Sequence, residues 1–350
     1  MAGELDRASG LGEGARLMLR GLEALGVPSW AVGPGRPTPP AGVPLVLHAN
    51  PATLALALLR LGPGVVRGRR IIAVWPWELD VVPEAWRAGF GFVHEVWAPS
   101  RFSAMAIGRA MPEGFGDPQA VRVVPYPVAC QPPAPAGLDR AALGLPVDAV
   151  ITLVVFNLAS SLERKNPLGA IAAHWAAFGD RADRLLLMRV GNPGHFPADF
   201  ARLEAAVRGM ANVRIETLTR PRDEADAVMA ACDIVLSLHR SEGFGLVPAE
   251  ALLLGKPVVA TAWSGTEDFL EDGWAARVPA RLVPAVDPRG VFEAPGATWA
   301  EPDVAAAAAW LVRLADDPAL RARMGEAGRV AGAARLGPGP IADAVRGLGL

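Results

Sequence analysis

The sequence predicts an α/β protein with two doubly wound domains. Short apolar runs, typical of buried parallel strands, alternate with helical segments through most of the 350 residues. A proline-rich stretch at 131–146 divides this alternation into two halves. We therefore expect a first domain at 1–135 and a second at 136–336.

The composition is that of a globular protein and excludes several functional classes. Apolar residues make up 51% of the chain and charged residues 20%. The net charge of −2 gives no reason to expect a nucleic-acid partner. Cys130 and Cys232 lie too far apart for metal-ligand spacing, so we expect free thiols and a reducing, cytoplasmic compartment. No signal core or membrane-spanning apolar run is found.

The first half begins with a glycine-rich segment. Residues 10–15 fit the dinucleotide pattern G-x-G-x-x-A, but no strand precedes them, which disfavours a nicotinamide or flavin site. We expect a flexible loop there, and then a helix at 17–25 that ends before Gly26. The remaining elements of this half are strands at 28–32, 44–48, 71–74 and 121–128, and a helix at 52–61.

The strand at 71–74 has unusual flanks. Arg67, Arg69 and Arg70 precede it and suit an anionic surface or phosphate, although a solvated face is the favoured interpretation. The tryptophans that follow, with Glu78 among them, have two interpretations. Aromatic rings stack on sugars and a carboxylate accepts from hydroxyls, or the rings fill the packing between domains. These alternatives are equal for Trp75 and Trp77, whereas packing is favoured for Trp86.

The second half opens with a continuous apolar strand at 149–156. Arg164 and Lys165 follow it, just before a helix at 168–178. Ligands bind at the carboxyl ends of strands in open α/β sheets, so these cations suit a departing diphosphate, although a surface pair is the alternative. Lys165 is one of only two lysines in the chain. Further strands are expected at 184–190 and 213–215, and helices at 220–231, after Asp303 and at 318–336.

A polar glycine loop separates a short strand at 234–236 from a helix that ends at Gly255. Two glycines allow close approach of the backbone to a ligand, and free amides at the helix start favour an anion. Glu242 and Glu250 are eight residues apart, or about 12 Å if helical. That spacing is too large for a shared proton but suits the two ends of a nucleotide diphosphate sugar. The alternative is a solvated loop acid and an ordinary helix-surface acid.

This loop resembles the signature of retaining GT-B glycosyltransferases of glycosyltransferase family 4. There, two glutamates bracket a Gly-aromatic-Gly turn, as Glu242 and Glu250 do here. Further matching runs are G-K-P-V-V-A-T at 255–261, S-G at 264–265, R-K-N-P at 164–167, W-E-L at 77–79 and V-W-A-P-S at 96–100. The resemblance implies two Rossmann-like domains facing a cleft, the first for the acceptor and the second for the donor. It also implies that a helix within 337–350 crosses back onto the first domain.

The resemblance implies transfer of a hexose from a nucleotide diphosphate sugar, with retention and without a metal. GDP-mannose is the first donor expected and UDP sugars come next; the acceptor is a glycan or lipid-linked sugar in polysaccharide biosynthesis. Glu242 would hold sugar hydroxyls, Glu250 the ribose, and Lys165 and Arg164 the diphosphate. The donor-binding set is completed by Gly243, Phe244, Gly245, Leu246, Ser264 and Gly265, and the acceptor side by Gly10, Gly12, Glu13, Trp75, Trp77 and Glu78.

The departures from the family pattern lie mainly in the first domain. Many members carry a histidine after the strand that corresponds to 71–74, where this chain has Trp and Glu78. Many also carry an arginine at the position of Ala159, a role that Arg164 would take here. No cofactor or metal site is expected, no D-x-D motif occurs, and peripheral contact with the inner membrane face is a further expectation. The rival functions are a non-catalytic sugar-nucleotide binder, and an epimerase or phosphorylase on the same fold.

Overall fold

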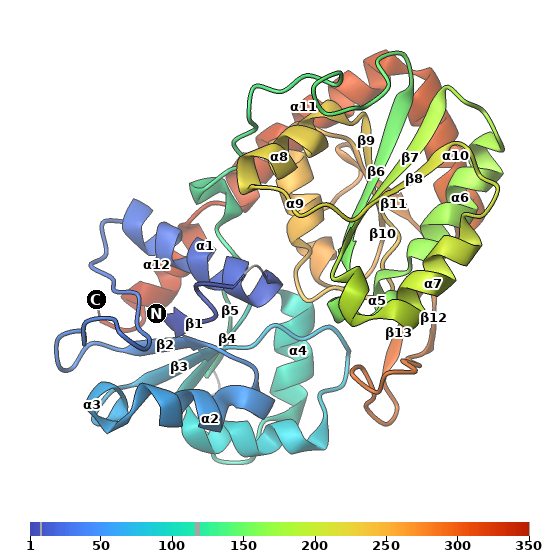
Figure 1. Ribbon diagram of the computed structural model, residues 1–350. Helices are drawn as coiled ribbons and strands as arrows, with labels where there is room; N and C mark the ends of the chain where they lie inside the picture. Colours follow the sequence, from blue (N-terminus) through green and yellow to red (C-terminus); the bar gives the residue numbers. More distant parts are fainter. Residues whose placement is uncertain (8, 116–119, 350) are drawn as a thin grey trace.

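The computed structural model describes residues 1–7, 9–115 and 120–349 and shows two lobes, each a sheet covered by helices (Figure 1). The first lobe holds a sheet with strand order β1-β2-β3-β4-β5, and the second a sheet with order β11-β10-β9-β6-β7-β8. All neighbouring strands in both sheets run parallel. The predicted α/β architecture is therefore confirmed.

The first lobe opens with a very short strand, so the expectation that no strand precedes the glycine-rich segment was wrong. This strand pairs with the second strand at only two positions, and Ala2 also bridges Val32. The strand expected at 28–32 was wrong, because only this single bridge forms there. The strands are β1 (Ala2–Gly3), β2 (Leu45–His48), β3 (Ile71–Val74), β4 (Glu95–Ala98) and β5 (Val121–Val123); the helices are α1 (Gly10–Ala24), α2 (Pro51–Leu61), α3 (Pro63–Val66), the 3₁₀ helix η1 (Glu84–Phe92) and α4 (Arg101–Ala110).

Helix α1 corrects the expected glycine loop. It begins at Gly10, because the Ser9 hydroxyl caps it by accepting from the Gly12 amide at 3.0 Å. Gly14 allows close packing, since a Cβ there would lie 2.6 Å from the Tyr126 ring. Cap and packing thus override the low helix propensity of glycine. Strand β5 stops at Val123, earlier than expected, and prolines follow at 125 and 127.

The second lobe follows a short 3₁₀ turn, η2 (Val128–Cys130), and the proline-rich connection. Its central strands are buried on both faces, as expected for a parallel sheet between helices. The elements are β6 (Val150–Asn157), η3 (Leu158–Ser160), α5 (Leu162–Lys165), α6 (Pro167–Phe178), β7 (Arg184–Gly191), η4 (Pro193–His195), α7 (Pro197–Ala206), β8 (Val213–Glu216), α8 (Arg222–Ala231), β9 (Ile234–Ser237), α9 (Leu246–Leu253), β10 (Val258–Thr261), η5 (Ser264–Asp268) and β11 (Ala275–Val278).

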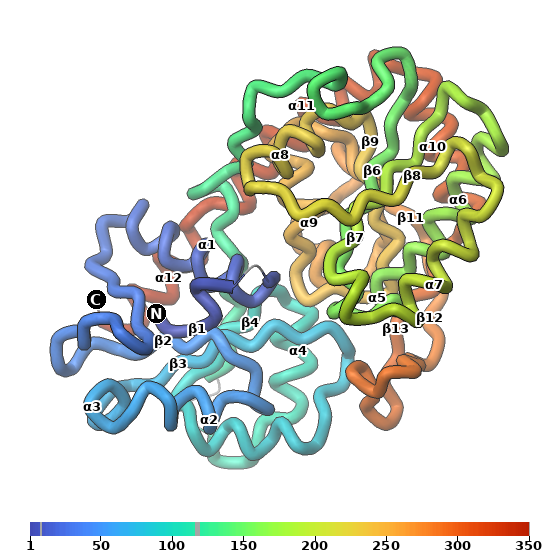
Figure 2. The backbone as a smooth tube through the Cα atoms, in the orientation of Figure 1, coloured from blue at the N-terminus to red at the C-terminus, as the bar shows by residue number. Residues whose placement is uncertain are grey.

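The last part of the chain adds a hairpin and three helices. Strands β12 (Ala280–Pro284) and β13 (Thr298–Pro302) pair antiparallel, outside both main sheets. Helices α10 (Val304–Asp316) and α11 (Pro318–Arg335) then cover the second lobe. Helix α12 (Gly339–Arg346) packs against α1, so the last helix returns to the first lobe (Figure 2). Leu350, the end of the predicted tail, lies outside the described residues.

The two lobes touch across the carboxyl ends of their strands. The Ser103 hydroxyl donates to the Trp77 carbonyl at 2.6 Å and lies 3.3 Å from the Gly243 carbonyl of the other lobe. The Tyr126 and Phe244 rings meet edge to face at 5.1 Å between centroids. Because the strands of both sheets end at this contact, their following loops can form one site. Among the described helices, none has the length and apolarity needed to cross a membrane.

Candidate functional site

The loop after β9 is held by the loop after β10. The Glu242 amide donates to the Ser264 hydroxyl at 2.8 Å, and the Glu242 carbonyl accepts from the Gly265 amide at 2.9 Å. A Cβ on Gly265 would lie 2.5 Å from the Gly243 carbonyl oxygen, so this close approach requires glycine. The structure thus brings together two segments that the sequence placed 22 residues apart. Their contact fixes the backbone that carries the Glu242 carboxylate.

The cations at the end of α5 meet this carboxylate. Lys165 Nζ donates to Glu242 Oε1, and Arg164 Nη1 lies 3.4 Å from Glu242 Oε2. Arg164 also donates to the Ser241 carbonyl at 2.7 Å. Burial alone would raise the pKa of Glu242, but Lys165 and Arg164 lower it to about 2. Burial lowers the pKa of Lys165, and the Glu242 charge opposes that change. The result is a nearly buried, charge-assisted cluster of the three residues predicted as catalytic.

Glu78 reaches the same cluster from the first lobe. It lies in the loop after β3, and its Oε1 is 3.9 Å from Arg164 Nη2. Burial raises the pKa of the Glu78 carboxyl, Arg164 lowers it, and Glu242 raises it further. The cation pair therefore faces one carboxylate from each lobe.

Glu250 belongs to a second cluster with the opposite balance of charge. Arg222 Nη2 donates to Glu250 Oε1 at 2.8 Å, and Arg222 Nε lies 2.9 Å from Asp226 Oδ1. Glu13 of the first lobe approaches Arg222 Nη1 at 3.5 Å. Burial raises the pKa of Glu250 to about 7, with Arg222 acting against it. Sequence reasoning did not single out Arg222. The only feature that pointed to it was the presence of an arginine in the predicted segment 220–231.

Backbone groups of the loop at 243–246 belong to the predicted donor-binding set. Within the part of the chain that the structure describes, the amides of Gly243, Phe244 and Gly245 have no recorded acceptor. Gly245 has φ of 101° at the N-cap of α9, a conformation that favours glycine, and Leu246 begins the helix. Such amides at a helix start favour an anion. The Phe244 ring is buried against Tyr126 and Phe269, so this residue presents only its backbone.

The tryptophans predicted as an acceptor wall are part of the core. Trp75 and Trp77 are 1% and 4% exposed. Trp75 meets Phe90 edge to face at 4.9 Å, and Trp77 Nε1 donates to the Val81 carbonyl at 2.8 Å. Their faces are therefore unavailable for stacking on a sugar. The rings pack instead, mainly within the first lobe and only in part between the lobes, where Trp77 meets Phe292. The physical reason is that these large rings fill the layer beneath the loop after β3.

The two predicted acceptor-side glycines differ in how closely they are packed. A Cβ on Gly12 would lie 2.5 Å from the Glu4 and Arg7 carbonyl oxygens, so Gly12 packs against its own N-terminal loop. Gly10, at the start of α1, has open space around it. Of the predicted acceptor-side residues, Glu78 alone reaches the Arg164 cluster, whereas Glu13 reaches Arg222.

Two buried histidines form hydrogen bonds next to the loops of the site. His239 bridges loops, with Nδ1 3.0 Å from the Ser237 hydroxyl and Nε2 3.3 Å from the Trp263 carbonyl. His48, which sequence reasoning missed, ends β2 with Nε2 2.9 Å from the Tyr126 hydroxyl. Burial lowers the pKa of His48 to about 4, so it is neutral at pH 7. The sequence feature that could have identified His48 is its position at the end of a buried strand.

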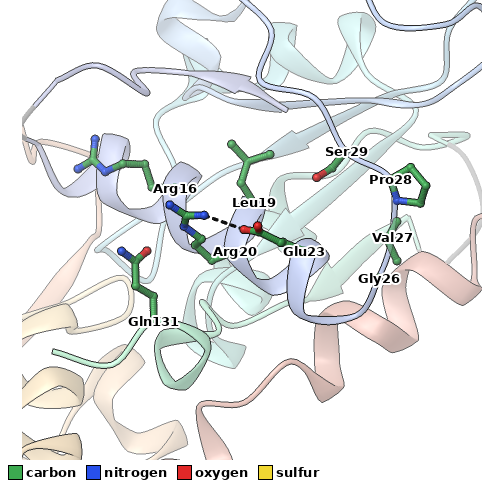
Figure 3. A pocket seen from close by; sticks show the side chains of 9 residues that line it. All are labelled: Arg16, Leu19, Arg20, Glu23, Gly26, Val27, Pro28, Ser29 and Gln131. Atoms are coloured by element: carbon green, nitrogen blue, oxygen red, sulfur yellow. Dashed lines mark hydrogen bonds and ion pairs between the residues drawn. The ribbon is translucent and has the colours of Figure 1, made fainter. Parts of the chain in front are cut away.

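Two surface cavities are lined by residues other than those of the two clusters. One of about 520 Å³ lies beside α1, between Arg16 and Gln131 (Figure 3). Another of about 650 Å³ is lined by Cys232 and Lys256. No predicted site residue lines either one, although Arg16 at the first cavity pairs with Glu13 at 2.6 Å. In the described ranges, no group of three or more His, Cys, Asp or Glu side chains is placed to hold a metal ion.

Sequence comparison identifies relatives of this chain. A family model described as "Family 4 Glycosyltransferase in conflict systems" matches residues 105–330. The D-inositol 3-phosphate glycosyltransferase of Acidothermus cellulolyticus is 30% identical over 239 residues, covering 66% of this chain and 50% of that protein. The enzyme of the same name from Thermobispora bispora is 33% identical over 210 residues, covering 59% and 44%. The chain thus spans about half the length of these curated relatives.

Solved structures give the fold. Anabaena HepE in complex with UDP and glucose aligns with a TM-score of 0.65 at 15% identity, covering 98% of this chain and 96% of that chain. WaaG, a glycosyltransferase involved in lipopolysaccharide biosynthesis, aligns with a TM-score of 0.60 at 16% identity, covering 96% and 95%. These likenesses show the GT-B fold. Because the family model covers more than half of the residues, the chain belongs to the family described as family 4 glycosyltransferases in conflict systems.

Proposed function

We propose that this protein is a retaining, metal-independent glycosyltransferase that moves a hexose from a nucleoside diphosphate sugar to a sugar hydroxyl. The observation that carries the proposal is the Arg164–Lys165–Glu242 cluster beside the loop at 243–245, whose amides have no hydrogen-bond partner among the described residues. Two cations, with backbone amides at the start of a helix nearby, suit the charge that develops on a departing diphosphate. A neutral ligand would gain little from that arrangement.

The roles of the residues follow from their surroundings. Lys165 and Arg164 stabilise the leaving diphosphate, while Glu242 orients Lys165 and accepts from hydroxyls of the transferred sugar. Glu250 accepts from the ribose.

In the reaction the bond from the anomeric carbon to the phosphate oxygen breaks, and the acceptor oxygen bonds to that carbon on the same face. The acceptor proton passes to the leaving phosphate oxygen, so no protein nucleophile is needed. Glu78 holds the acceptor hydroxyl from the first lobe.

The donor and acceptor remain proposals at the level of chemical class. GDP-mannose and UDP sugars are the donors to test, and the UDP and glucose bound to HepE support including UDP-glucose. The acceptor that we propose is a glycan or lipid-linked sugar of a polysaccharide pathway. The relatives named D-inositol 3-phosphate glycosyltransferases support adding inositol 3-phosphate to the acceptor panel.

We also propose a cytoplasmic location with peripheral contact to a membrane. Both cysteines are free thiols, which supports a reducing compartment. Helix α2 exposes Leu56 and Leu59 beside Arg60, a combination that suits an anionic bilayer surface. Arg69 does not contribute, because it is buried and donates to the Pro39 and Pro40 carbonyls. Co-sedimentation with anionic vesicles that is lost in Leu59→Glu would support this contact.

The function is tested by measuring nucleoside diphosphate release. The purified protein is incubated with GDP-mannose, UDP-glucose, UDP-N-acetylglucosamine or dTDP-glucose, with and without alkyl hexosides and inositol 3-phosphate. We expect release that depends on an acceptor and a product whose anomeric configuration, measured by NMR, matches the donor. Donor binding without release would identify a non-catalytic binder, and conversion of the donor sugar without an acceptor an epimerase. A phosphorylase would need inorganic phosphate, and a pyridoxal absorption band would mark some members of that class.

A further inference from the structure

The hairpin of β12 and β13 has no part in the proposed roles, yet its loop reaches the cation pair. The hairpin follows β11 and precedes α10, and the loop at 285–297 extends from the second lobe beside α5 (Figure 1). The loop buries one polar and one aromatic side chain, those of Asp287 and Phe292, although strand β12 before it is largely exposed. Buried polar and aromatic groups on a surface loop call for an account of what they contact.

Asp287 holds the start of α5. Its carboxylate is 1% exposed and accepts from the amides of Val291 and Phe292, both at 3.2 Å, which folds the loop onto itself. The Ser161 hydroxyl donates to Asp287 Oδ1 at 3.1 Å and accepts from the Arg164 amide at 3.3 Å. The single hydroxyl proton is thereby committed to Asp287, which leaves a lone pair for that amide.

Ser161 is strained, so its conformation depends on partners. It has φ of 69° at the N-cap of α5, a region that residues other than glycine rarely occupy. The hydrogen bond to Asp287 holds the serine in this conformation. Because the next four residues form α5, the same bond sets the direction of the helix that ends at Lys165.

Phe292 holds the guanidinium of Arg164. The ring lies 4.9 Å from Arg164 Cζ, at a distance typical of a cation–π contact. The other sides of the guanidinium contact the Ser241 carbonyl, Glu242 and Glu78. The guanidinium is therefore supported on its face by the ring and at its edges by oxygen atoms. Without the ring, the edge contacts would remain but the plane would be free to tilt.

The hairpin also reaches the first lobe. Phe292 stacks on Trp77 at 5.8 Å between ring centroids, with 29° between the planes. Thr298, at the start of β13, donates to Asp80 from its amide at 2.8 Å and from its hydroxyl at 2.7 Å. Trp77 and Asp80 lie on either side of Glu78 in the sequence. The hairpin therefore contacts both the segment that carries the Glu78 carboxylate and the Arg164 guanidinium.

We propose that Asp287 and Phe292 are positioning residues, which fix Arg164 and Lys165 between the Glu242 loop and Glu78. This inference rests on the proposed function for its effect on turnover, but not for its effect on the order of α5. Since the hairpin loop contacts Arg164 and not the ribose end, we expect the loss of these contacts to lower kcat and to change the donor KM little. The binding contributed by Glu250 is unchanged.

The first experiment measures kinetics in matched variants. Phe292→Leu keeps an apolar side chain but removes the aromatic face, and Phe292→Tyr restores that face. We expect Phe292→Leu to lower kcat about tenfold or more while the donor KM changes less than about threefold, and Phe292→Tyr to recover most of the rate. Trp310→Leu is the control, because it removes a comparable contact, with Arg313 at 5.0 Å, from a helix outside the site. Wild-type kcat in Phe292→Leu would overturn the proposal.

The second experiment does not depend on catalysis. Hydrogen–deuterium exchange of the free protein reports on the amides of 160–166, and we expect faster exchange there in Asp287→Ala and Phe292→Leu. Exchange in α6 serves as the internal reference. Unchanged exchange at 160–166 in both variants would overturn the inference even if transfer is observed. Faster exchange there in a protein that transfers no sugar would uphold the positioning role and reject the proposed function instead.

Discussion

Glu242 and Glu250 belong to one motif and are each 8% exposed, yet the structure gives them opposite electrostatic settings. Glu242 faces two cations and has a pKa of about 2, whereas Glu250 shares Arg222 with Asp226 and Glu13 and has a pKa of about 7. Burial is the same, so the neighbours decide the protonation state. One end of the proposed donor site is therefore rich in positive charge and the other end in acids.

The largest test of this comparison removes the positive end. Lys165→Ala should lower kcat about 10²- to 10³-fold, because it removes a preorganised charge from the departing diphosphate. The rate of nucleoside diphosphate release measures the effect. Lys256→Ala is the control, since Lys256 is the other lysine of the chain and lines a cavity away from Glu242. Its rate should stay within about threefold of wild type. Near-normal transfer by Lys165→Ala would exclude the phosphate role.

The second test concerns stability at the positive end. The folded pKa of Glu242, about 2, is below the ordinary value of 4.5, so its stabilisation is present above pH 4.5 and lost as pH falls toward 2. The difference corresponds to about 3 kcal/mol. We expect urea unfolding of Glu242→Gln to show about this loss at pH 7 and a smaller one at pH 3. A difference between wild type and variant that does not change with pH would contradict the assigned pairing with Lys165 and Arg164.

The third test uses the pKa of Glu250, which is raised where that of Glu242 is lowered. Its folded pKa, about 7, is above the ordinary 4.5, so the folded protein keeps a proton that a ribose-binding carboxylate must lose. Donor affinity should therefore weaken about five- to tenfold between pH 7.5 and pH 6, when measured by calorimetry with an intact nucleotide sugar. Glu250→Gln should bind weakly with no such slope. A wild-type affinity that stays constant over this range would remove Glu250 from the ribose site.

The sequence placed Lys165 and Glu242 in loops that follow predicted strands, and the order of strands in the structure explains why the two residues meet. Strands β6 and β9 are neighbours in the sheet, so their following loops, which both carried recognisable motifs, lie at one edge. The opposite pKa values were not predictable, because Arg222 comes from a segment without a motif and Glu13 from one assigned to the acceptor side, and only the folded chain brings them to Glu250.

The hairpin and the tryptophans show a second limit of sequence reasoning. A glycine- and proline-containing loop at 285–297 has no periodicity that points Phe292 toward Arg164, 128 residues earlier in the chain. The sequence around Trp75 and Trp77 reads the same whether these rings stack on a sugar or pack against other side chains of the protein. Only the packing of Trp86 and Phe90 against them decided between the two interpretations.

The smallest test asks whether the acid-rich end belongs to one lobe or both. Glu13 is the acid that comes from the first lobe, and its 3.5 Å approach to Arg222 is weakened by the 48% exposure of that arginine side chain. Glu13 also pairs with Arg16 at 2.6 Å. Glu13→Gln should change the free energy of unfolding by less than about 0.5 kcal/mol, because partly exposed ion pairs contribute little.

Donor affinity in the same variant gives the sharper answer. If the second lobe alone forms the ribose end, Glu13→Gln should change the dissociation constant for the nucleotide sugar less than about twofold, an energy within the range of an exposed ion pair. Asp226→Asn provides the contrast, because Asp226 is buried and pairs with the same arginine at 2.9 Å. A larger effect on affinity from Glu13 than from Asp226 would mean that Arg222 takes its working position from the first lobe. In that case closure of the two lobes, and not the second lobe alone, would complete the donor site.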